Sequence, residues 1–305
     1  MRTSAIALAA LLLSLPRALD GQVGWFPDRR AFDGPVADPL EPRVAGGLVF
    51  TDLLEVRPGV PHERPAFTIG EPADDLESDL QATVALGGTV PLWGTRFGSD
   101  GALVVAPQLA VFARFRLEPP SRDEAGSDWV VALPLEVRFD DRLSGRVRLM
   151  HRSAHLGDEL MQVDGGPLRL EFSIEAVDGL VAFRPLPGVR VYGGGTLILR
   201  SQTFRWVDGG GGTVAATVDF DDSFEVQVGA EADGGGVWRW RVAADVRAAQ
   251  RSEWDTGVAA IAGVGRAVAG RELRLHARLQ SGVSSLGEFF RTDEQLWGIE
   301  LEFVP

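Results

Sequence analysis

The chain contains a series of segments, each about ten residues long, in which apolar and polar side chains alternate. In residues 129–139, Val131, Leu133 and Leu135 share one face, while Glu136 and Arg138 lie on the other. The same pattern recurs at 108–117, 168–176, 224–232, 238–248, 271–280 and 296–305. A period of two is typical of β-strands with one apolar and one polar face. The pattern therefore predicts an all-β fold.

Three features favour an antiparallel transmembrane β-barrel over a soluble sandwich. The segments have the length of a tilted strand that crosses a bilayer, about 9–11 residues, whereas strands of soluble proteins average about five or six. Arginine and glutamate recur in mid-strand on the polar face, as expected for the lumen of a barrel. Aromatic residues stand near strand ends, where the interfacial girdles of a membrane barrel lie: Trp93, Trp129, Trp297 and Phe303.

About twelve strands are predicted, an even number as in bacterial outer-membrane barrels. Their approximate ranges are 43–54, 80–92, 103–117, 129–139, 143–154, 168–182, 188–201, 223–233, 237–249, 256–268, 271–282 and 295–304. Long connections follow the odd-numbered strands and short turns follow the even-numbered ones. This alternation is typical of barrels with short periplasmic turns and longer outer loops.

The N-terminus predicts export. Arg2 precedes an apolar run at 5–15, the pattern of a cleaved signal peptide. We therefore predict a signal peptide at 1–21, an extended periplasmic lead-in at 22–42, and an outer-membrane barrel at 43–305. The formal net charge of −13 argues against a nucleic-acid partner, and the absence of cysteine excludes disulfides and thiolate metal sites.

Three stretches resemble known sequences: one an assembly signal, and two a protein family. The last strand, with Trp297 and Phe303 on one face, resembles the C-terminal signal read by the bacterial barrel-assembly machinery, which is therefore an expected partner. "ADPLEPR" (Ala37–Arg43) and "HRSAHLGDE" (His151–Glu159) resemble a family of bacterial outer-membrane proteins of unassigned function. This resemblance implies a barrel and no particular activity.

The stretch at 151–159 also suggests chemistry. Continuing the alternation of 143–154 places His151 and Ser153 on the outer, lipid-facing wall, about 6.5–7 Å apart. A histidine at that spacing can accept a proton from a serine hydroxyl. The pair is similar to outer-membrane phospholipase A and to the lipid A deacylase of outer membranes. That resemblance implies Ser153 as nucleophile and His151 as base, with Asp158 or Glu159 orienting the histidine or holding calcium.

Two other interpretations stay open for this stretch. His151 and Ser153 can simply be the polar rim of a strand that leaves the membrane. Alternatively, His151 and His155 could bind a metal with Asp158 or Glu159, although residues four apart on a strand are separated by about 13 Å. The sequence departs from the two hydrolase families after the serine, where they have Asn-Gly and this chain has Ala154 and His155.

Many charged residues fall on the strand faces that are predicted to point into the lumen. The predicted lumen-lining residues are Arg114, Arg116, Glu136, Arg138, Arg146, Arg148, Glu171, Glu175, Arg239, Arg241, Arg274, Arg278, Glu300 and Glu302. They could form a salt-bridged interior or a path for small anions such as acidic sugars. The predicted function is thus a narrow channel or a structural barrel in the bacterial outer membrane, without a cofactor. The alternative is an acyl hydrolase of outer-membrane lipids that could use calcium.

Overall fold

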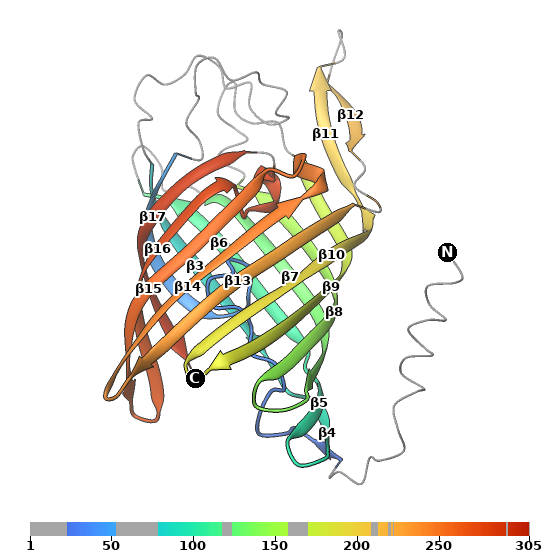
Figure 1. Ribbon diagram of the computed structural model, residues 1–305. Coiled ribbons are helices and arrows are strands. Elements are labelled where there is room, and N and C mark those ends of the chain that lie inside the picture. The colour runs from blue at the N-terminus through green and yellow to red at the C-terminus, as the bar shows by residue number, and fades with distance from the viewer. Residues whose placement is uncertain are drawn as a thin grey trace, which may run out of the picture.

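Twelve antiparallel strands close on themselves to form a barrel (Figure 1). The computed structural model describes residues 23–52, 79–117, 124–157, 170–208, 213–218, 221, 223–290 and 292–304. The barrel strands are β2 (Val44–Thr51), β3 (Asp79–Thr89), β6 (Gln108–Arg116), β7 (Glu124–Arg138), β8 (Leu143–Leu156), β9 (Leu170–Leu186), β10 (Val189–Ser201), β13 (Phe224–Gly235), β14 (Trp238–Ala249), β15 (Thr256–Val268), β16 (Arg271–Val283) and β17 (Asp293–Val304).

The first and last barrel strands form the closing seam. β17 pairs with β2 in antiparallel register, from Leu296 opposite Thr51 to Phe303 opposite Val44. The prediction of an all-β antiparallel barrel of about twelve strands is confirmed. The helical elements in the described residues are two 3-10 turns, η1 (Gln250–Ser252) and η2 (Gly287–Phe289). No helix within the described ranges has the length and apolarity needed to cross a bilayer.

The two ends of the barrel differ. At one end, here called the turn end, brief turns join β7 to β8, β9 to β10, β13 to β14 and β15 to β16. Gly188 and Gly270 have φ of 72° and 80° in two of these turns, a conformation that favours glycine. In the β7–β8 turn, the backbone N–H groups of Leu143 and Arg142 each donate a 2.7 Å hydrogen bond to Asp140, which lowers the pKa of that carboxyl. The opposite end, the loop end, has most of the long connections.

Small sheets extend the barrel at both ends. β4 (Trp93–Phe97) and β5 (Gly101–Val105) form a hairpin at the turn end, and β1 (Gly24–Trp25) pairs with β4. β11 (Thr203–Asp208) and β12 (Thr213–Val218) form a hairpin at the loop end. The single strand predicted at 103–117 is wrong in this detail, because it is divided into β5 and β6. Pro107 lies between them, and proline has no N–H to continue the ladder.

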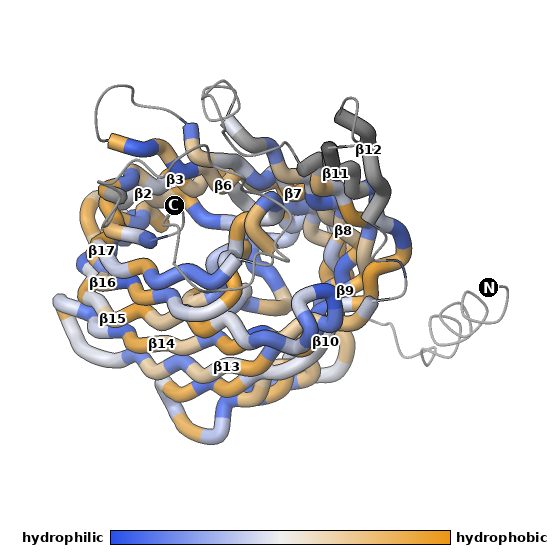
Figure 2. Tube along the Cα trace, turned by 90° about the horizontal axis from the view of Figure 1, so that it is seen from above, coloured by the Kyte–Doolittle hydropathy of each residue, from blue (hydrophilic) through white to orange (hydrophobic). Residues whose placement is uncertain are grey.

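Side-chain alternation separates an apolar outer face from a polar interior. On β7, Val131 and Leu133 point outward and are 55% and 52% exposed, whereas Glu136 points inward and is 0% exposed. Figure 2 shows the alternation of hydrophobic and hydrophilic residues around the ring. The outer face is therefore suited to lipid, and the buried polar interior requires partners for its charges.

The chain upstream of β2 runs inside the barrel (Figure 1, dark blue). It passes from β1 at the turn end into the lumen, where Phe32 and Asp38 are each 1% exposed. The sequence predicts an extended periplasmic lead-in at 22–42, and the structure shows its described part, from residue 23, running into the lumen. Residues 30–43 are called the plug below.

Candidate functional site

Glu136 of β7 anchors the first part of the plug. Its carboxylate accepts hydrogen bonds from Nε and Nη2 of Arg30, at 2.9 and 2.6 Å, and from the backbone N–H groups of Ala31 and Phe32, at 3.0 and 3.1 Å. Arg30 balances the charge of the buried carboxylate. A mid-strand glutamate thus satisfies two backbone donors that would otherwise be buried without partners.

Phe32 fixes the plug through its ring. It packs against Leu180 and Tyr192, which point inward from β9 and β10. The guanidinium carbons of Arg146 and Arg190 lie 5.2 and 5.0 Å from the ring centroid, which is the geometry of cation–π contacts. An aromatic side chain therefore supplies apolar packing in a lumen otherwise rich in charge.

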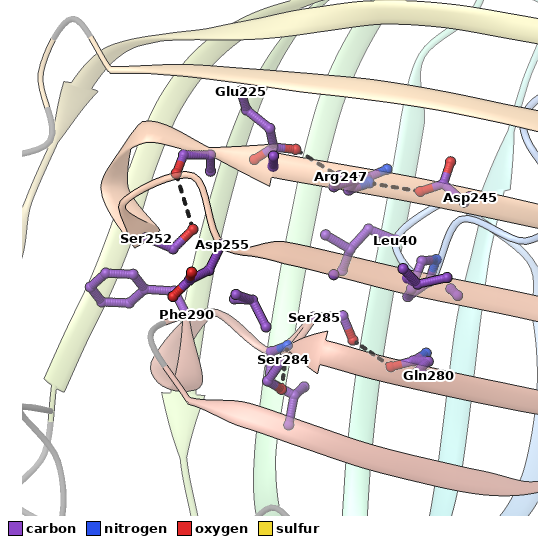
Figure 3. Close-up of a pocket in the computed structure, with 18 of the residues that line it drawn as sticks. Leu40, Glu225, Asp245, Arg247, Ser252, Asp255, Gln280, Ser284, Ser285 and Phe290 are labelled. Atoms are coloured by element: carbon purple, nitrogen blue, oxygen red, sulfur yellow. Dashed lines mark hydrogen bonds and ion pairs between the residues drawn. The ribbon is translucent and has the colours of Figure 1, made fainter. Parts of the chain in front are cut away.

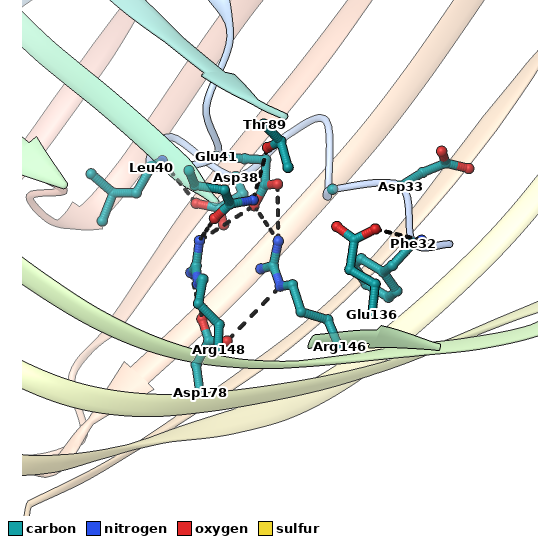
Figure 4. A network of polar contacts seen from close by, with 12 residues as sticks. Phe32, Asp33, Asp38, Leu40, Glu41, Thr89, Glu136, Arg146, Arg148 and Asp178 are labelled. Atoms are coloured by element: carbon teal, nitrogen blue, oxygen red, sulfur yellow. Dashed lines mark hydrogen bonds and ion pairs between the residues drawn. The ribbon is translucent and has the colours of Figure 1, made fainter. Parts of the chain in front are cut away.

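The "ADPLEPR" stretch forms the centre of the plug (Figure 4). Both oxygens of Glu41 lie 2.9 Å from Nη1 of Arg146, and one lies 3.9 Å from Nη1 of Arg148. Asp38 forms an ion pair with Arg247 of β14 and accepts a 3.4 Å hydrogen bond from Gln227 of β13. This motif therefore holds the plug to two separate parts of the wall, β8 and β13–β14.

Two further contacts attach the plug to β13 and β17. The backbone N–H of Val36 donates a 2.8 Å hydrogen bond to Glu231 of β13. Nε and Nη2 of Arg43, at the end of the plug, each lie 3.1 Å from an oxygen of Glu300 on β17. The plug is thus tied to the wall along its whole length.

A second segment fills the loop end. Residues 284–290, here called the cap, connect β16 towards β17 and contain η2. The backbone N–H of Gly287 donates to both oxygens of Asp128 at 3.1 Å, and Nη2 of Arg152 donates to the carbonyl of Ser285 at 2.5 Å. Phe290 of the cap is 4% exposed, and its ring centroid lies 5.9 Å from that of Phe172 on β9.

Cavities remain in the lumen beside the plug and the cap. A cavity of about 70 Å³ lies between the plug, the cap and β13–β16 (Figure 3). In it, Arg247 is held between Glu225 and Asp245. Two larger cavities, of about 420 and 390 Å³, lie at the turn end. Residues of the plug line the second of these and the cavity beside the cap.

Most of the residues predicted to line the lumen lie on the inward face of their strands. The structure places twelve of them there: Arg114, Arg116, Glu136, Arg138, Arg146, Arg148, Arg239, Arg241, Arg274, Arg278, Glu300 and Glu302. The side chain of Glu171, like all of Asp158 and Glu159, lies outside the described residues. Sequence reasoning missed the partners of these residues in the plug, because the segment at 22–42 shows no periodicity.

The prediction for Glu175 is wrong, since it lies on the outer face and is exposed. The prediction assumed that Phe172 and Ile174 point outward because they are apolar. Instead they point inward and form a buried cluster with Ile198 and Phe290 of the cap. The inward face of β9 is therefore apolar at this level, and the polar residues of the strand face outward.

Because Glu175 points outward, it lies beside the two outward residues of "HRSAHLGDE". His151 and Ser153 lie on the outer face of β8, as their parity predicted, with His151 exposed and Ser153 half-buried. In the β8–β9 register, His151 is opposite Glu175 and Ser153 is opposite Ser173. Within the described residues, these four side chains have no hydrogen-bond or ion-pair partner.

The metal-site alternative receives no support from this geometry. His151 and His155 both lie on the outward parity of one extended strand. Among the described residues, no group of three or more His, Cys, Asp or Glu side chains is placed to hold a metal ion.

The closed ring, the even number of strands and the apolar outer face define a β-barrel of the outer-membrane type. The chain belongs to the family described as "Protein of unknown function (DUF1207)", whose model matches residues 62–304. The plug lies upstream of the matched range. No curated protein matches the chain by sequence.

Solved structures with a similar course of the chain are bacterial barrels. Outer membrane phospholipase A from Escherichia coli is 13% identical to this chain, with a TM-score of 0.46. The match covers 90% of this chain and 94% of the phospholipase chain. The translocator domain of autotransporter NalP from Neisseria meningitidis is 10% identical, with coverages of 98% and 97% and a TM-score of 0.40. The anion-selective porin from Comamonas acidovorans is 10% identical, with coverages of 85% and 97% and a TM-score of 0.33. Such distant similarity carries no functional argument.

Proposed function

We propose that this protein is a structural barrel of the bacterial outer membrane whose lumen is closed by its own N-terminal plug. One observation carries the proposal: residues 30–43 contact inward side chains from β7, β8, β9, β10, β13, β14 and β17. A segment tied to most of the wall is a resident part of the lumen. The predicted signal peptide and the exposed apolar wall support the location.

The charges of the lumen favour a closed barrel over an anion pathway. An arginine ladder that attracts anions needs guanidinium groups free to bind them. Here Arg146 pairs with Glu41, Arg247 with Asp38, and Arg278 with Glu300 at 2.7 Å. Paired charges of this kind bind the plug and the wall together instead of a passing solute.

Conductance measurements test this proposal. The purified, refolded mature barrel should show no steady ion current in planar bilayers, because the plug and the cap obstruct the lumen. An open general porin in the same bilayers is the positive control. Steady current with anion selectivity would overturn the closed barrel in favour of the narrow channel.

A second candidate is an acyl hydrolase, and the position of Glu175 favours it. Cross-strand partners in a sheet have Cβ atoms about 4.5–5.5 Å apart, so Glu175 can orient the His151 ring. His151 would then take the proton of Ser153 as its oxygen attacks an ester carbonyl of a membrane lipid. No hydrogen bond joins the three side chains here, and such contacts often form only with bound substrate.

Lipid hydrolysis tests the second candidate. Phospholipid or lipopolysaccharide in mixed micelles is incubated with the barrel, with and without calcium, and released fatty acid is measured by mass spectrometry. Under this candidate, Ser153→Ala abolishes release, whereas Ser173→Ala, a change to its cross-strand partner on the same face, retains it. Absence of release, or equal release from wild type and Ser153→Ala, eliminates the hydrolase.

A further inference from the structure

A row of four outward side chains crosses β14 to β17 near the turn end. Trp238 lies opposite Arg266, Arg266 opposite Leu273, and Leu273 opposite Phe303. Trp238 and Leu273 are 59% and 42% exposed. Arg271 lies two residues before Leu273 on the same face of β16. Two cations and two aromatic rings therefore share one patch of the outer wall.

Each arginine of this patch rests on a ring. The guanidinium carbon of Arg266 lies 5.5 Å from the Trp238 centroid, and that of Arg271 lies 5.4 Å from the Phe303 centroid. These contacts orient the guanidinium groups and leave their N–H donors available. Both arginines are exposed, and within the described residues neither has a carboxylate partner.

Among the residues that the structure describes, the surroundings of the two arginines supply apolar surface and no anion. The outward neighbours on these strands are Trp240, Val264, Leu275 and Leu301, all exposed. Glu272, next to Arg271 in sequence, has the inward parity and accepts hydrogen bonds from Arg274 at 3.0 and 3.1 Å. Arginines of the plugged lumen such as Arg146 and Arg278 pair with protein carboxylates, whereas within the described residues this outward pair has none and is open to an external anion.

We propose that Arg266 and Arg271 bind the phosphate of a phospholipid in the leaflet at the turn end, with its acyl chains along Leu273, Leu275 and Trp240. As diagonal cross-strand neighbours, the two arginines lie about 7–8 Å apart at Cα, close enough for both to reach one phosphate. The planar guanidinium fork matches phosphate oxygens. The proposal rests on the membrane location proposed above, but does not depend on whether the lumen is closed.

Lipid retention tests the site. The mature barrel is purified in micelles containing phosphatidylglycerol, and the lipid that stays bound is counted by native mass spectrometry. The double variant Arg266→Gln with Arg271→Gln should bind phosphatidylglycerol about 25-fold more weakly, since each arginine near a membrane surface contributes about fivefold. Arg200→Gln is the matched control, because Arg200 is an exposed arginine at the loop end of β10, and it should retain the lipid.

The other outcomes are equally informative. Equal retention by the double variant, or equal loss with Arg200→Gln, overturns the site. Complete displacement of the lipid by excess inorganic phosphate also overturns it, since a phosphate-only site would not need the apolar neighbours. If the glutamine variant fails to fold, as judged by its mobility in electrophoresis, the corresponding lysine variant should show an intermediate loss, and full retention by that variant contradicts the role of the guanidinium forks.

Discussion

The double variant Asp38→Ala with Glu41→Ala is expected to expose its plug to solvent at least about 100-fold more often than the wild-type barrel. Both carboxylates are buried and hold Arg247 and Arg146. Removing one partner of a buried ion pair costs about 3–5 kcal/mol, and each 1.4 kcal/mol is about a tenfold change in population. The two changes should therefore weaken the attachment of the plug.

A single introduced thiol measures this exposure, because the chain has no cysteine. Ala37→Cys places the thiol in the plug at a position that is 3% exposed. Its rate of reaction with a water-soluble maleimide reports the population in which the plug is released. Asp33→Ala is the control, since this side chain is 71% exposed and its pair with Arg184 should change the rate less than about fivefold. Equal rates in the double variant and the wild type would show that these ion pairs do not retain the plug.

Replacing Glu136 with alanine is expected to lower the free energy of unfolding by about 3–5 kcal/mol. The substitution removes the acceptor for Arg30 and for two buried backbone N–H groups of the plug. Unfolding in urea, followed by electrophoretic mobility, measures the loss. Glu136→Gln keeps an acceptor oxygen and should lose less.

The control for this variant is Asp233→Ala. The Asp233 side chain is 53% exposed and lies 3.6 Å from Arg241, so its loss should cost less than about 1 kcal/mol. If Glu136→Ala is no less stable than Asp233→Ala, the contacts to Arg30, Ala31 and Phe32 contribute little to the folded barrel.

The barrel wall could be predicted from sequence because strand pairing follows a local property. Within each strand, apolar and polar residues alternate with a period of two, and this alternation marks the outer and inner faces. Val131 and Leu133 could therefore be assigned to the outside without knowing their neighbours. The assignment failed at Glu175, because the inward residues of β9 there are apolar and belong to the buried cluster of Phe172 and Phe290. That cluster depends on the cap, more than 100 residues away in sequence, and nothing local to β9 indicates it.

The plug could not be predicted for a related reason. Its contacts join residues far apart in sequence, as Arg30 and Glu136 show, and residues 22–42 carry no periodic pattern. A signal was nevertheless present in the lumen, where charges such as Glu136 and Arg146 require partners once they are buried. The charged residues of the plug are those partners: Arg30 pairs with Glu136, and Glu41 of "ADPLEPR" pairs with Arg146.

The ion pair between Arg43 and Glu300 has a consequence for assembly. Arg43 ends the plug and immediately precedes β2, while Glu300 belongs to the last strand, so this pair lies across the seam where the first and last strands meet. A completed ring filled with side chains leaves little room for threading a segment through it. We therefore expect the plug to take its place before β2 pairs with β17. The strands of the wall would then assemble around the plug.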